Sequence, residues 1–340
     1  MSVAAAPASV QPPPAALVAL GALGVLATAA AATALPLLVY SVSLAAFGLA
    51  HVLAELRYVD TRFGARIAGR LRGSLVALLV GVFALRALAV VGVQLPHAKL
   101  LELGLVVALC ATVLPALLAR SRALGALSGL VVVGFAALAW RWPLETLFVL
   151  TFTHNLTPVG FVAERLRGRQ RALALVACAA VFGLIPLSIA SGLPLRLLEA
   201  WGAARPEASV LPTVTDLGAH LGAFLPQSLQ RDPERTLSLF AAAAYLQCMH
   251  YAAVLHVLPG FDAEGGWSGP QNLLPWPTRG RFTVALVGAG ALLAVFFWVD
   301  FAGARRGYGT LAAVHAWVEL PLLLLALGVP AEPAAPPVSA

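Results

Sequence analysis

Long runs of consecutive apolar residues recur along the whole chain and decide what it can fold into. About twenty such residues in an α-helix span the roughly 30 Å hydrocarbon layer of a bilayer. Hydrophobic residues make up 60% of the 340 residues and charged residues 11%, against roughly 45–50% and 25% in soluble domains. The sequence therefore predicts an all-α, polytopic integral membrane helical bundle.

We expect the spans to be helical, because an isolated strand cannot satisfy its backbone hydrogen bonds in lipid. The apolar runs predict about ten spans, at approximately residues 15–34, 36–57, 74–95, 98–119, 123–141, 143–163, 172–192, 236–259, 282–303 and 308–328. The first boundary rests only on Leu35 and Pro36, and one broken helix is the alternative. Residues 15–328 are thus predicted to form a single transmembrane helical domain.

The segments outside the spans are short, with four exceptions. Residues 1–14 and 329–340 are rich in Ala and Pro and are predicted to be disordered tails. Residues 193–235 and 260–281 are predicted to be longer interfacial loops, the first of them with an amphipathic helix. The basic residues are dispersed among the loops, as in a multi-pass membrane protein, so we expect no nucleic-acid partner.

The arginines also predict an orientation. Residues 57–72 carry five arginines, and the other loops on that side add further basic residues. Cytoplasmic loops hold the excess of Lys and Arg, so both termini are predicted to be cytoplasmic, in a bacterial-type inner or plasma membrane. Arg305 and Arg306, assigned to a loop on the other side, oppose this orientation.

Four histidines lie within spans that are predicted to run in the same direction: His51, His154, His250 and His315. At about 1.5 Å per residue, they fall in one band near the middle of the membrane. Glu55 and Glu319 follow two of them by four residues and so share a helix face with them. A polar group in hydrocarbon costs roughly 2–3 kcal/mol or more unless it is paired or ligated. We interpret these residues as parts of one metal site.

The chemistry of such a site follows from its ligand types. Several imidazoles with carboxylates suit iron, copper or zinc, and a carboxylate either binds the metal or orients a histidine ligand. Fe(II) is the predicted ion, with another transition metal as the alternative. His256 is a further candidate, although six residues of helix, about 600° of rotation, turn it away from His250. The competing interpretation of each single histidine is a hydrogen bond between helices.

Other polar residues give weaker signals. His97 and His220 are predicted to be interfacial or solvated. Arg86 and Asp300 are either buried ion-pair partners or residues that reach toward the interface. Asn155, with Thr157 and Pro158, predicts a bent, cavity-lining segment.

Three short segments resemble the Brp/Blh type of membrane β-carotene dioxygenase. Residues 47–51 (Phe-Gly-Leu-Ala-His) with Glu55 resemble its Gly-Leu-Pro-His element and the acidic residue that follows. Residues 245–250, with His256, resemble its aromatic-rich segment with paired histidines, and His315 with Glu319 resembles its last helix. The family's other acid-bearing histidine element has only His154, or His97 with Glu102, as candidates. The resemblance implies Fe(II)-dependent cleavage of a long apolar polyene from the bilayer to retinal-type aldehydes.

The sequence thus favours a metal-dependent membrane oxidoreductase or oxygenase that acts on a lipid-soluble substrate, such as a carotenoid or another polyene or lipid. Its expected partners are the bilayer and an apolar small molecule. The alternative is a proton-coupled transporter or channel, since intramembrane His and Glu also serve as proton relays. Haem binding by two facing histidines and an intramembrane protease, for which Glu164 and Arg167 form only a fragment of a motif, rank lower.

Overall fold

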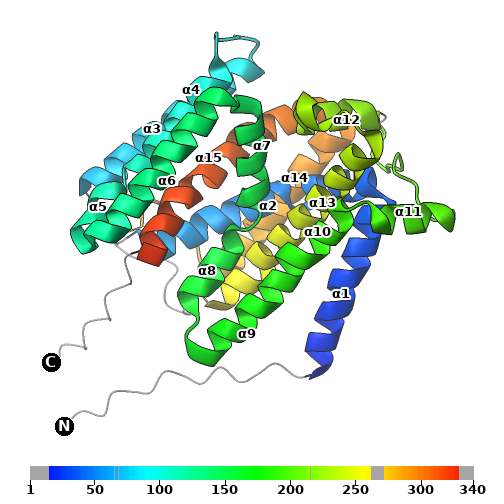
Figure 1. Ribbon diagram of the computed structural model, residues 1–340, viewed down its shortest axis with the longest axis horizontal. Helices are drawn as coiled ribbons and strands as arrows, with labels where there is room; N and C mark the ends of the chain where they lie inside the picture. The colour runs from blue at the N-terminus through cyan, green and yellow to red at the C-terminus, as the bar shows by residue number, and fades with distance from the viewer. Residues whose placement is uncertain (1–14, 65, 68, 215, 262–271, 329–340) are drawn as a thin grey trace.

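A computed structural model of the protein describes residues 15–64, 66–67, 69–214, 216–261 and 272–328. These residues form helices and contain no strand. Nine of the described helical segments are long and apolar enough to cross a membrane, and a bent helix pair would make a tenth. The predicted all-α, multi-pass bundle is confirmed (Figure 1). The predicted tails, residues 1–14 and 329–340, lie outside the described residues.

The candidate spans lie close to the apolar runs of the sequence. They are α1 (Ala15–Ala34), α2 (Pro36–Phe63), α3 (Gly69–Val90), α4 with α5 (Ala98–Ala111 and Leu114–Arg120), α6 (Arg122–Arg141), α9 with α10 (Gly168–Ala179 and Ile185–Ala190), α13 (Pro233–Ala252), α14 (Arg279–Val299) and α15 (Phe301–Gly328). A π-helical turn at Ala253–Val257 extends α13. The predicted loop 193–235 contains the short helices α11 (Leu193–Ala200) and α12 (Leu217–Phe224).

The weak first boundary proves to be a helix end. Leu35 leaves the helical conformation with φ −136°, and Pro36, whose fixed φ and missing N–H suit a first turn, begins α2. Figure 1 shows α1 and α2 running in different directions from this point. The alternative of one broken helix is therefore wrong.

The bent pair consists of α7 (Pro143–His154) and α8 (Thr157–Arg165), which meet at 42°. The Asn155 side chain donates to the carbonyl oxygens of Thr151 and Phe152, and Pro158 lies in the first turn of α8. The predicted bend is confirmed, and it places His154 at the break, facing the interior.

The last two spans begin and end elsewhere than predicted. The break lies at Asp300, rather than between residues 303 and 308. The Asp300 carboxylate accepts a hydrogen bond of 2.9 Å from the Gly303 N–H, which is otherwise unsatisfied at a helix start. Arg305 and Arg306 therefore lie in the first turns of α15 rather than in a loop.

Four helices run in parallel through the centre of the bundle. At one end, the Tyr40 ring of α2 lies 5.2 Å from the Phe240 ring of α13 and 6.2 Å from that of Phe301 in α15. About three turns further on, His51 lies 5.3 Å from His250 and 4.9 Å from His315 in the same helices.

The bent pair follows the same course. Phe148 of α7 lies 5.9 Å from Phe224 at the first end, and Glu164 of α8 pairs with Arg62 at the far end of α2. The pair therefore extends along the bundle as one span. The four helices that carry His51, His154, His250 and His315 therefore run in the same direction, as the comparison of histidine depths required.

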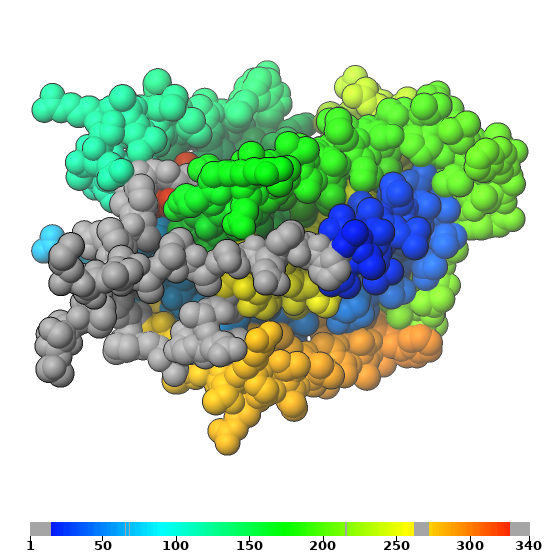
Figure 2. Space-filling view, turned by 90° about the horizontal axis from the view of Figure 1, so that it is seen from below, coloured from blue at the N-terminus to red at the C-terminus, as the bar shows by residue number. Residues whose placement is uncertain are grey.

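The central helices are covered by the others. Among the candidate spans, α2, α13 and α15 are the most buried, whereas α1, α3, α9–α10 and α14 expose apolar side chains outward. In Figure 2, α13 (yellow) lies between α9 (green) and α14 (orange). An apolar exterior around a polar interior is the arrangement that a lipid environment stabilises.

Candidate metal centre

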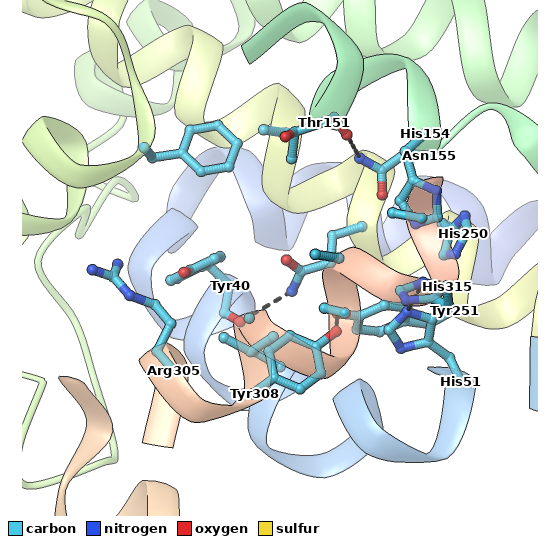
Figure 3. Close-up of a pocket in the computed structure, with 18 of the residues that line it drawn as sticks. Tyr40, His51, Thr151, His154, Asn155, His250, Tyr251, Arg305, Tyr308 and His315 are labelled. Carbon is cyan, nitrogen blue, oxygen red and sulfur yellow. Dashed lines mark hydrogen bonds between the residues drawn. The ribbon is translucent and has the colours of Figure 1, made fainter. Parts of the chain in front are cut away.

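Five buried residues from four helices converge at the middle of the bundle. They are His51 and Glu55 of α2, His154 of α7, His250 of α13 and His315 of α15. One potential ligand atom of each lies within 4.8 Å of the corresponding atom of every other. Figure 3 shows the four imidazoles grouped at one end of a cavity. This group is able to hold a metal ion.

The distances are close to those of a coordinated ion. The Nε2 atoms of His51 and His315 are 3.2 Å apart. The Oε2 atom of Glu55 lies 3.2 Å from Nε2 of His250 and 3.8 Å from Nε2 of His315. Two ligands about 2.1 Å from one ion can be at most about 4.2 Å apart. Small side-chain movements would therefore bring all five onto a single ion.

Several polar atoms of the cluster have no hydrogen-bond partner among the described residues. Both carboxylate oxygens of Glu55, whose side chain is fully buried, make no hydrogen bond. The same holds for both ring nitrogens of His250 and for Nδ1 of His315. Buried polar and charged groups are costly unless they are paired or ligated. A cation bound among them would compensate the carboxylate and accept the nitrogen lone pairs, so the residues fit a metal.

Glu319 lies beside the cluster and contacts His154. Its Oε2 atom is 2.9 Å from Nδ1 of His154, which leaves Nε2 of that ring for a ligand. His51 is oriented in a similar way, since its Nδ1 lies 3.3 Å from the Phe47 carbonyl oxygen of its own helix. Glu319 was predicted as a ligand or as an orienting residue, and its position suits the second role.

The structure does not bring His256 to the cluster. It lies in the π-helical turn after α13 and is exposed, whereas the five clustered side chains are buried. The physical reason is helical rotation, because six residues carry a side chain well away from the face of His250.

Tyr251 is a neighbour of the cluster that the sequence analysis did not single out. Its ring stacks on that of His51, with centroids 4.0 Å apart and planes at 28°. Its hydroxyl lies 3.5 Å from that of Tyr308. The position next to His250 was the only available signal, and it does not reveal a contact with another helix.

Three other charged residues in or near the spans have structural roles. Arg86 pairs with Glu102 at 2.6 Å, and the Trp317 indole donates to the same carboxylate at 2.9 Å. Arg86 is therefore an ion-pair partner, and Asp300 is a helix cap. Asp60 accepts hydrogen bonds from the backbone N–H groups of Leu273 and Leu274.

A cavity of about 220 Å³ adjoins the histidines. His51, His154, His250 and His315 line one end of it, and Tyr40 and Arg305 line the other (Figure 3). The cavity exceeds the roughly 150 Å³ that accommodates a benzene molecule. A ligand in this cavity can therefore lie against the histidines of the cluster.

Comparisons of this chain with models of protein families, with curated proteins and with solved structures give no match. The resemblance of the short histidine motifs to the Brp/Blh type stays a prediction from the sequence.

Proposed function

We propose that the protein is an integral-membrane, metal-dependent oxidoreductase, with Fe(II) as its ion and a lipid-soluble molecule as its substrate. The observation that carries this proposal is the convergence of four buried imidazoles and one buried carboxylate from four helices. A single polar side chain in a span is common as a helix contact. Five that converge beside a cavity form an arrangement suited to ligation.

The donor set supports a transition metal. Imidazole suits iron, copper, zinc and nickel, whereas magnesium and calcium prefer oxygen ligands. His51, His154, His250, His315 and Glu55 would hold the ion, and Glu319 would keep His154 in position. The chemistry that iron supplies when bound is activation of dioxygen for oxidation of the substrate.

The surroundings support an apolar substrate. The bundle keeps bulk water from the cluster, and an apolar exterior allows a lipid-soluble molecule to enter from the bilayer. Carotenoids and other polyenes or lipids belong to this class. The resemblance to the Brp/Blh type points to the same kind of reaction, oxidative cleavage of a polyene.

The decisive experiment is the metal content of the purified protein after iron-supplemented expression. We expect a stoichiometric transition metal in the wild type and its loss in His51→Ala, His250→Ala and His315→Ala. The matched control is His256→Ala, which should keep the metal because that side chain lies outside the cluster. Gel filtration in detergent verifies that each variant is folded.

Two outcomes would contradict the proposal. One is a folded wild type without stoichiometric metal. The other is unchanged metal in all three cluster variants. Proton-coupled flux in liposomes made with metal-free protein would favour the transporter alternative.

A further inference from the structure

The cavity beside the candidate metal centre has a second polar end, about three helical turns away. The lining of the cavity as a whole includes two arginines, Arg86 and Arg305, and no carboxylate of the described residues. Arg86 is neutralised by Glu102 and also donates to the Gly309 carbonyl oxygen. Among the described residues, no carboxylate lies within ion-pair distance of Arg305. Its polar contacts are His220, at 3.5 Å, and Tyr40.

His220 does not neutralise Arg305 either. It lies on α12, which covers this end of the cavity, and it is buried against the rings of Tyr40 and Phe301. Of the two predicted positions for His220, interfacial or solvated, the solvated one is wrong. Burial, and then the nearby Arg305, lower the pKa of His220, whereas Asp216 opposes the shift. The imidazole is therefore neutral at pH 7. The Arg305 guanidinium thus lies at the cavity wall with no ion-pair partner among the described residues.

Between the two ends, small residues line the cavity together with the polar side chains of Gln247 and Tyr308. On α15, Arg305 and His315 are ten residues apart, about 15 Å along the helix axis, with Gly309 and Ala312 facing the cavity between them. On α13, Ala243 and Ala244 occupy the corresponding stretch before His250. The small residues of α13 and α15 leave a passage from the arginine to the histidines, which Gln247 and Tyr308 also line.

We propose that this cavity binds a single-chain amphiphile with an anionic headgroup, held by Arg305 and Tyr40, with its hydrocarbon chain directed toward the candidate metal centre. Arginine forms strong paired hydrogen bonds with carboxylates and phosphates. A cavity of about 220 Å³ leaves no room for two chains side by side. The inference deepens the proposed function and rests on it for the reaction. It places the oxidised position about 15 Å from the headgroup, because that helix rise separates the histidines from the arginine.

Binding in a non-ionic detergent tests the headgroup. Oleate and oleyl alcohol share one chain and differ in charge, so the wild type is expected to bind oleate at least tenfold more tightly in titration calorimetry. Arg305→Gln should lose that preference and retain the affinity for oleyl alcohol. Arg306→Gln is the matched control, since Arg306 is the exposed neighbour outside the cavity lining. Lysophosphatidic acid with the same acyl chain, compared with oleate, distinguishes a phosphate from a carboxylate headgroup.

The passage is tested by Ala312→Leu, which fills it without altering either end. This variant is expected to lose at least tenfold in oleate affinity with unchanged metal content. Equal affinity of the wild type for oleate and oleyl alcohol overturns the inference, as does a preference that survives in Arg305→Gln. Metal content is measured separately, so that bound metal without an oleate preference refutes this inference alone. An oleate preference without metal refutes the proposed function alone.

Discussion

Each carboxylate near the cluster contacts a histidine of another helix. Glu55 follows His51 by four residues but lies 3.2 Å from His250. Glu319 follows His315 by four residues but contacts His154. The spacing of four places a carboxylate and a histidine on one helix face, and that face then meets the neighbouring helices. The sequence therefore predicted the face of each carboxylate and not its partner.

Substitution of Glu319 should weaken metal binding. In Glu319→Ala, His154 loses the carboxylate that lies 2.9 Å from its Nδ1 atom, and we expect metal affinity to fall by about 10–100-fold. Glu319→Gln retains an acceptor oxygen and should lose less. Competition with a chelator of known affinity measures the effect. An affinity equal to that of the wild type in Glu319→Ala would mean that the 2.9 Å contact has no role in ligation.

At the scale of elements, α15 carries both His315 and Arg305, and its start depends on Asp300. Asp300→Ala removes the acceptor of the Gly303 N–H, and we expect the free energy of unfolding to fall by about 0.5–2 kcal/mol. Asp300→Asn, which preserves a capping oxygen, should be close to the wild type. Thermal unfolding in detergent tests the pair, and equal melting temperatures for the wild type and Asp300→Ala would refute the role of this cap.

Hydropathy predicted the helices well and failed at the start of α15 for a physical reason. A charged residue is penalised in a span, so Arg305 and Arg306 were assigned to a loop. In the structure, Arg305 lies inside the helix at a cavity wall. The sequence does not reveal a cavity formed by several helices, so the charge alone was misleading.

Some features of the candidate site could likewise be predicted from the sequence, and others could not. The depth of each histidine along its span depends on rise per residue, and depth alone selected His154 without any motif. The stacking of Tyr251 on His51 and the cavity itself depend on how separate helices pack, which no local spacing encodes.

For the whole molecule, metal binding and stability should be linked. A ligand that binds only the folded state stabilises it by about 2.7 kcal/mol at a free concentration 100 times its Kd. Chelation should therefore lower the melting temperature of the wild type. In His250→Ala the chelator should have little effect, because the complete ligand set is already lost. A melting temperature of the wild type that does not respond to chelation would contradict this linkage.

The distribution of the ligands along the chain also governs the order of biosynthesis. His51 and His315 are 264 residues apart, although their Nε2 atoms lie 3.2 Å from each other. The ribosome therefore delivers the first two ligands, on α2, long before the last one, on α15. Throughout that interval the nascent chain carries Glu55 without its final neighbours, and α15 then completes the cluster. If the cluster binds a metal, the full ligand set can therefore take it up only after α15 has joined the bundle.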